Sequence, residues 1–188
     1  MNSIRESHKQ TVYKPNAMVM IQQRPLNLLT LLFLLSITML TGCNRSSDQR
    51  QFEQEAFSTP EGITETDDSG NVINRDPDDW RISPFFQGVI EVDPAYPNPV
   101  LTNQLVRINH IITGVESVSG LRVFVFYQSG NVRLIDEDIR NPLPPGIGIT
   151  TLEPNLISEF PENPQGLYRI VITDVNENVI TYGDIRIN

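Results

Sequence analysis

The chain contains very little cysteine, lysine or histidine. Its 188 residues include a single cysteine, Cys43, and its only lysines are Lys9 and Lys14. One cysteine excludes a framework of intrachain disulfides. After Cys43 the chain has ten arginines and twenty-two acidic residues, a formal charge of −12. Because nucleic-acid binding needs clustered lysines and arginines, we expect no nucleic-acid partner. The same acidic excess repels anionic lipid headgroups.

Long hydrophobic runs are also missing, with one short exception over Leu28–Leu40. At 1.5 Å per residue these thirteen residues cover roughly 20 Å, less than the ~30 Å of hydrocarbon that a membrane span crosses. Arg24 precedes the run and small residues follow it. A basic start, a short apolar centre and small residues before a cleavage point predict a signal peptide over residues 1–42. An uncleaved signal anchor, tilted to span the bilayer, and a buried core helix remain as alternatives.

The end of this segment, Leu40-Thr41-Gly42-Cys43, resembles the lipobox of bacterial lipoproteins. The resemblance implies that a diacylglycerol is attached to the Cys43 sulfur. It also implies cleavage between Gly42 and Cys43 and acylation of the new amino terminus. Several acyl chains, at about 0.8 kcal/mol per buried CH₂, make such an anchor effectively permanent. Asn44 follows the cysteine in place of aspartate, which by the same resemblance favours the outer membrane of the cell envelope.

Residues 1–17 are too polar for a compact signal peptide. Met18 and Met20 both lie just before the basic residue that opens the signal. We therefore interpret one of these two methionines as the true start and residues 1–17 as an upstream extension.

Residues 43–79 differ in composition from the rest of the chain. Few of them are apolar, and Phe52, Phe57, Ile63 and Val72 show no sustained period of 2 or 3.6. Such a stretch buries too little surface to offset its ordering entropy, so the sequence predicts a disordered acidic tether that begins at the lipidated Cys43. A short helix over residues 49–57 is the alternative.

Three acid-rich stretches offer the oxygen ligands that Ca²⁺ prefers, at residues 67–71, 76–79 and 174–178. None follows the spaced loop of a calcium site, and the last has Val179 where such a loop has glycine. We interpret them as solvated turns, with a calcium site as the alternative. The sequence predicts no metal site and no cofactor.

From Trp80 onward, short apolar runs are broken by proline and glycine. The alternation predicts seven short strands, a turn of helix near residues 155–159, and a bulge at Gly183. Together they predict an all-β domain over residues 80–188, a single β-sandwich of about seven antiparallel strands. The expected strands are 86–92, 105–113, 121–128, 132–135, 149–152, 166–174 and 179–187.

The order of motifs in this part resembles small immunoglobulin-like (Ig-like) modules. They occur in flagellar hook-cap proteins and at the carboxyl termini of Bacteroidetes-type secreted proteins. The motifs are a Pro97-Asn98-Pro99 turn, the aromatic run Phe124-Val125-Phe126-Tyr127 before a glycine hairpin, and Gly166-Leu167-Tyr168. The chain closes on Asp184–Asn188 and not on a basic strand, so the resemblance implies the fold more than a sorting role. Tyr168 suggests a tyrosine corner, and Trp80 a plug at one end of the sandwich.

Catalytic motifs are lacking. His110 is the only histidine after Cys43, and it lies among aliphatic residues in an expected strand, which favours a structural histidine over a general base. Asp136, Glu137 and Asp138 offer paired acids for glycoside chemistry, but adjacent side chains point in different directions, so solvated loop acids are the simpler interpretation. The sequence predicts no catalytic residue.

Two classes of function remain. The first is a lipid-anchored envelope protein whose Ig-like domain is a non-enzymatic binding or structural module with a protein or envelope partner. Its expected contact surfaces are the loops 141–148 and 153–165 and a sheet edge at 179–187. The second is a carbohydrate-active or hydrolytic protein, which requires acidic side chains that converge in a cleft.

Overall fold

The computed structural model describes residues 44–188 of the chain. The predicted signal peptide, its cleavage after Gly42 and the lipid on Cys43 lie outside the described residues. No helix within residues 44–188 is both long and apolar enough to cross a membrane.

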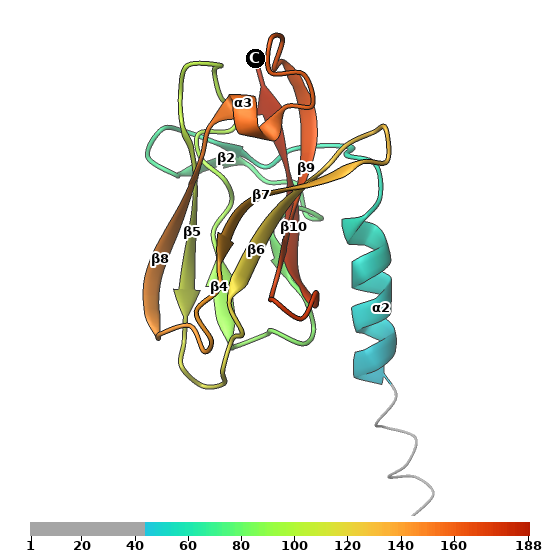
Figure 1. Ribbon diagram of the computed structural model, residues 1–188, viewed down its shortest axis with the longest axis vertical. Coiled ribbons are helices and arrows are strands. Elements are labelled where there is room, and N and C mark those ends of the chain that lie inside the picture. Colours follow the sequence, from blue (N-terminus) through green and yellow to red (C-terminus); the bar gives the residue numbers. More distant parts are fainter. Residues whose placement is uncertain (1–43) are drawn as a thin grey trace, which may run out of the picture. The chain divides into compact units, whose positions relative to one another are not determined.

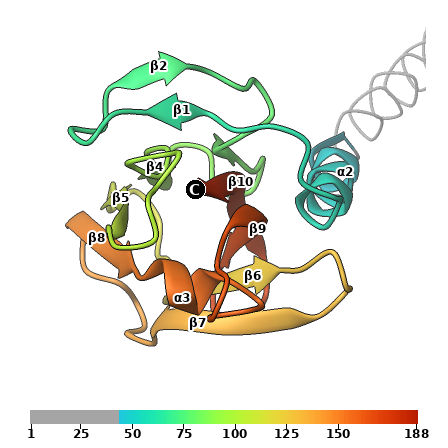
Figure 2. The same cartoon turned by 90° about the horizontal axis from the view of Figure 1, so that it is seen from above.

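Two antiparallel sheets face each other in the described part of the chain (Figures 1 and 2). The larger has the strand order β3-β10-β9-β6-β7 and the smaller the order β4-β5-β8. The larger sheet consists of β3 (Arg81–Ile82), β6 (Leu121–Phe126), β7 (Val132–Asp138), β9 (Gly166–Thr173) and β10 (Val179–Ile187). The smaller consists of β4 (Ile90–Val92), β5 (Val106–Ile112) and β8 (Gly146–Leu152).

Alternation along the strands creates the core between the sheets. In β6 the residues Leu121, Val123 and Val125 are buried, while their neighbours in sequence are half-buried. Every second side chain of a strand points to the same face, so these three pack inward together. Ile108 of β5, Leu152 of β8 and other aliphatic residues meet them from the smaller sheet. The predicted all-β sandwich is confirmed.

The predicted strands are present, with differences at their ends. Only Ile90–Val92 of the first predicted strand is extended, because residues 86–89 form turns in which Val89 and Ile90 donate to the Phe86 carbonyl. The strand predicted at 132–135 continues to Asp138, since Leu121–Val123 of β6 pair with its last residues. The predicted helical turn is α3 (Pro154–Ile157).

The prediction of a disordered tether is wrong for residues 44–79, here called the N-terminal segment. It forms helix α2 (Asn44–Ala56), a hairpin of β1 (Glu65–Thr66) and β2 (Val72–Asn74), and turns that lead into β3. The alternative short helix is therefore confirmed and extended. Phe52 and Ala56 of α2 pack on Val171, Val179 and Tyr182, on the outer face of the larger sheet. Figure 2 shows α2 outside that sheet and the hairpin beside the gap between β4 and β10.

Strand β10 is an interior strand, which corrects the expectation of a free edge at residues 179–187. It pairs with β9 along its whole length and with β3 at Thr181 and Tyr182. Beyond β3, the backbone N–H groups of Asp184 and Arg186 are bound by side chains of the N-terminal segment and of the loop after β4. The edge strands are β3 and β7 in the larger sheet and β4 and β8 in the smaller one.

Trp80 is buried directly on the backbone of Gly183. A Cβ atom on Gly183 would lie 2.2 Å from Trp80 Cε2 and 2.4 Å from its Nε1, so only glycine fits beneath the indole. The bulge of β10 lies instead between Val179 and Thr181. Gly183 therefore serves close packing of Trp80.

Candidate functional site

A buried ion pair joins the two longest strands of the larger sheet. Arg169 of β9 and Asp184 of β10 are direct antiparallel neighbours, and their side chains are only 6% and 2% exposed. Arg169 Nε donates to Asp184 Oδ1, and Arg169 Nη2 donates to Oδ2 at 2.9 Å. Such a two-bonded pair fixes both side chains in one orientation. The Arg169 guanidinium also lies 4.8 Å from the centre of the Tyr182 ring.

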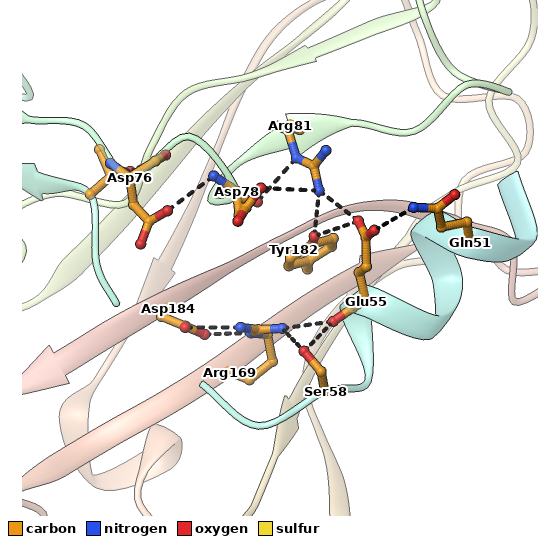
Figure 3. Close-up of polar contacts among 10 residues, drawn as sticks. Gln51, Glu55, Ser58, Asp76, Asp78, Arg81, Arg169, Tyr182 and Asp184 are labelled. Atoms are coloured by element: carbon orange, nitrogen blue, oxygen red, sulfur yellow. Dashed lines mark hydrogen bonds and ion pairs between the residues drawn. The ribbon is translucent and has the colours of Figure 1, made fainter. Parts of the chain in front are cut away.

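The same arginine binds the end of α2 (Figure 3). Arg169 Nη1 donates to the Glu55 carbonyl at 2.9 Å and to Ser58 Oγ at 3.3 Å. The last carbonyls of a helix have no partner within the helix, so a cation there satisfies an otherwise unbound acceptor. Glu61 N then donates to Asp184 Oδ2 at 3.2 Å. Arg169 and Asp184 together hold the chain as it leaves α2.

Asp79 extends this network into the interior. Its carboxylate accepts hydrogen bonds from Thr64 N at 2.7 Å and from Asp184 N at 3.1 Å. Burial, and next the negative charge of Asp184, raise the pKa of Asp79 from 3.8 to about 7. A pKa near 7 leaves the Asp79 carboxyl partly protonated at neutral pH, while Asp184 is paired with Arg169.

Asn98, in the proline-rich turn after β4, fastens the N-terminal segment to β10. The side chain is fully buried. Its Nδ2 donates to the Thr64 carbonyl at 3.0 Å and to the Asp184 carbonyl at 2.9 Å, and its Oδ1 accepts from Arg186 N at 3.0 Å. Its backbone also exchanges hydrogen bonds with Thr66. One asparagine thus binds two chain segments that lie more than a hundred residues apart.

Two hollows flank these contacts. The larger, of about 530 Å³, is an open groove between α2 and β3 where Arg81 binds Glu55 at 2.7 Å and the Tyr182 hydroxyl at 2.7 Å. The smaller, of about 270 Å³, is lined by the network around Asp184 and by several acids. The Arg81 hydrogen bond lowers the pKa of Glu55. The two arginines at these hollows, Arg81 and Arg169, are thus already paired with acids.

A third hollow, of about 150 Å³, brings together residues that the sequence had singled out separately. His110 of β5 lines it with Asp136 and Asp138 of β7 and with Arg140. The sequence predicted that the three acids at 136–138 lie in a solvated loop. They lie instead on strand β7. Sequence could not show this convergence, because β5 and β7 belong to different sheets.

The groups in this hollow are poorly suited to catalysis. Arg140 Nε donates to both carboxylate oxygens of Asp138, at 2.9 and 3.0 Å, and lowers its pKa. Burial lowers the pKa of His110, whose ring makes no hydrogen bond to any described residue and lies over Gly148 of β8. The volume is below the 300–1,000 Å³ of usual ligand pockets. The arrangement is that of a histidine that covers a glycine at the open side of the sandwich.

The acid-rich stretches at 67–71 and 174–178 are turns held by an aspartate, as interpreted from the sequence. Asp67 Oδ1 accepts from Ser69 N at 2.8 Å and from Asn71 N at 2.9 Å. Asp174 Oδ1 accepts in the same way from the backbone N–H groups two and four residues further on, both at 2.9 Å. Within residues 44–188 no group of three or more acidic, histidine or cysteine side chains is arranged to hold a metal ion.

Tyr168 forms the predicted corner at the start of β9. Its hydroxyl donates to the Pro164 carbonyl at 3.0 Å and lies 2.9 Å from Ser158 Oγ. The loop between α3 and β9 is thereby tied down at its base, while Phe160 within it is 66% exposed. This loop belongs to the surface 153–165 that the sequence suggested for contacts.

Comparison with known proteins gives no family. No protein-family model matches the chain, and no curated protein does. Among solved structures it is similar to a Jonesia denitrificans lytic polysaccharide monooxygenase, with 20% identity over 47% of this chain and a TM-score of 0.30. The match covers 54% of that chain, so this protein spans about half its length.

Two further solved structures are similar at the same level. The CARDB domain of a Pyrococcus furiosus protein, in complex with di-metal ions, shares 19% identity over 53% of this chain and 86% of its own, with a TM-score of 0.32. The AA10 lytic polysaccharide monooxygenase from Streptomyces lividans shares 13% identity over 73% of this chain and 85% of its own, with a TM-score of 0.31. Matches this distant carry no argument about activity, metal or ligand.

Proposed function

We propose that this chain is a lipid-anchored protein of the bacterial cell envelope whose Ig-like sandwich is a non-enzymatic binding or structural module. The supporting observation is the order of the N-terminal segment. Helix α2 begins at Asn44, directly after the proposed lipidation site, and packs on the larger sheet. An anchor on Cys43 would thus be joined to the sandwich through a docked helix and not through a long flexible tether.

The state of the polar groups favours binding over catalysis. Arg169, Asp184 and Asp79 are occupied in holding the N-terminal segment, and Asp138 is bound to Arg140. The module would then act through its surface, where the loop 153–165 exposes Leu156 and Phe160. Loops that a rigid sandwich positions are common contact surfaces.

The anchor is tested by expressing the full chain in a bacterial host that processes lipoproteins. The wild type should stay with the membrane after a high-salt wash, and mass spectrometry should find Cys43 as an acylated amino-terminal residue. Cys43→Ser should lose the acyl groups and the membrane association. An unmodified thiol at Cys43, still joined to the upstream apolar peptide, would overturn the lipid anchor.

The contact surface is tested by crosslinking in intact envelopes. A partner captured by the wild type should be lost from Phe160→Asp, while His110→Asn, in the small hollow, should capture it equally. Loss in His110→Asn with retention in Phe160→Asp would instead support a ligand site at the hollow.

A further inference from the structure

The chain enters the described domain at one particular end. Helix α2 runs in the same direction as β10, since Gln49 Nε2 donates to the Val179 carbonyl at 3.3 Å and Glu61 N donates to Asp184. The start of α2 therefore lies near the start of β10, at the end of the sandwich that holds the turn between β9 and β10. This end is called the entry end below.

Two long loops share the entry end with the start of α2. Residues 113–120 join β5 to β6, and residues 139–145 join β7 to β8. The strand register puts them there, because Ile112 pairs with Gly146 and Leu121 pairs with Asp138, whose neighbours lead into the loops. Figure 1 shows the β5–β6 loop and the start of α2 at the same end of the domain, opposite the end that holds α3.

Large apolar side chains are exposed in and beside these loops: Val115 lies in the first loop, Ile139 directly follows β7, and Ile147 is the second residue of β8. Ile147, Val115 and Ile139 are 77%, 76% and 69% exposed, the three highest values among the large hydrophobic side chains of residues 47–188. The loops themselves are packed: Leu143 is buried and its N–H donates to the Val118 carbonyl at 2.8 Å. The exposed side chains are thus carried by loops that are packed against each other.

We propose that the entry end of the sandwich docks on the surface of a lipid bilayer, with Val115, Ile139 and Ile147 entering the interface between headgroups and acyl chains. The proposal rests on the proposed lipid anchor. A bilayer is the expected binding partner because of the end at which the preceding residues join the described domain. The apolar run Leu28–Leu40 and Cys43 precede Asn44 immediately, so an acylated Cys43 and an uncleaved anchor both bring the bilayer to this end.

Charge determines which bilayer suits this surface. The chain after Cys43 has a formal charge of −12, and Glu116 and Glu177 are exposed in the loop and turn of the entry end. Anionic headgroups would be repelled, so the docking is expected on zwitterionic lipid and to be driven by the apolar side chains. The opposite end, with Phe160 and the loop 153–165, is then turned away from the membrane toward a partner.

The test is a depth measurement on the lipid-bearing full-length protein, reconstituted in phosphatidylcholine vesicles. An acylated Cys43 leaves no free thiol, so single cysteines in Val115→Cys and Ile147→Cys accept an environment-sensitive fluorophore. Glu162→Cys, at the opposite end, is the matched control. Spin-labelled acyl chains in the vesicles should quench the first two probes at least about twofold more strongly than the third, because interfacial side chains reach roughly 5–10 Å into the bilayer boundary.

A second pair of variants keeps the probe and changes the surface. With the fluorophore at Val115→Cys, Ile139→Asp and Ile147→Asp together should reduce quenching to the level of the Glu162→Cys control, whereas Phe160→Asp should leave it unchanged. All variants should still float with the vesicles and melt as the wild type does.

The outcomes separate the anchor from the orientation. Protein that does not float with vesicles overturns the lipid anchor and the docking together. Protein that floats but shows equal quenching at both ends, or stronger quenching at Glu162→Cys, overturns the docking alone.

Discussion

Arg169 and Asp184 lie opposite each other on β9 and β10, and their paired side chains are also the point at which the N-terminal segment is held. The guanidinium binds the carboxylate with two nitrogens and the end of α2 with the third. Asp184 in turn accepts from Glu61 N. The pair therefore links three parts of the chain that are separate in sequence, and its loss should affect the segment and the sheet together.

Arg169→Met is expected to destabilise the domain by about 3–5 kcal/mol, because it leaves the Asp184 carboxylate buried without a counter-charge. Urea denaturation measures the change. Arg140→Met is the control, since Arg140 pairs with Asp138 at the surface, where an ion pair contributes little. Equal stability of Arg169→Met and wild type would show that the pair is not needed.

The raised pKa of Asp79 should make stability depend on pH. The folded chain binds the proton more tightly than the unfolded one, so this contribution is fully present below about pH 4. It is lost as the pH rises toward the folded pKa of about 7. Asp79→Ala should reduce this decline, and what remains comes from Asp184, whose pKa burial also raises. Asp78→Ala, at the exposed neighbour, should keep the decline in full.

Burial lowers the pKa of His110, so its contribution to stability changes with pH in the opposite sense to that of Asp79. The Asp79→Ala and Asp78→Ala variants are therefore compared with the parent chain in a His110→Asn background, by urea denaturation between pH 5 and pH 8. The Asp79 carboxyl carbon, followed by NMR, should show a midpoint near pH 7. A midpoint below pH 5 would contradict the expectation.

Gly183→Ala should be strongly destabilising because its Cβ would lie within 2.5 Å of the Trp80 ring. Overpacking of this kind costs about 1–3 kcal/mol and sometimes more. Trp80→Leu in the same chain should relieve the clash, so the double variant should lose less stability than the two single changes added together. Strict additivity in thermal denaturation would show that the two residues are not in contact.

Amide hydrogen exchange tests the order of the N-terminal segment. The amides of residues 47–56, of Thr64 and of Thr66 should exchange slowly, since they are helical or donate to Asp79 and to the Asn98 carbonyl. Phe52→Ala should speed exchange in α2 and expose Arg50 to trypsin, because Phe52 supplies much of the apolar contact with Val171 and Tyr182. Exchange of the whole segment within seconds in the wild type would restore the disordered tether.

The strands of the sandwich were predictable because each buries alternate side chains, and Leu121, Val123 and Val125 show that period directly. The ordered structure of the N-terminal segment was not predictable. Its buried apolar residues, Phe52, Ala56 and Ile63, follow no regular period. Much of what holds the segment is polar and distant in sequence: Arg169, Asp184 and Asn98. In the sequence these look like any surface charge or turn residue, since nothing local marks an acid that will be buried.

The position of β10 was misjudged for a related reason. Its apolar pattern predicts a strand, but not which strands flank it. Strand β3 has only two residues, too few for a strand pattern to be recognised in the sequence. The side chains that bind the rest of β10, those of Asp79 and Asn98, belong to turns. The convergence of His110 with Asp136 and Asp138 was likewise invisible, because it depends on how two sheets meet.

The interior place of β10 also bears on how the domain is made. Strand β10 comes after all other strands in the chain, yet β9 and β3 flank it, and α2 packs against it. During synthesis, the larger sheet therefore cannot close until the residues up to Ile187 have emerged from the ribosome. Until then β3 has no strand to pair with, and α2 can contact only β9 of the two strands on which it packs.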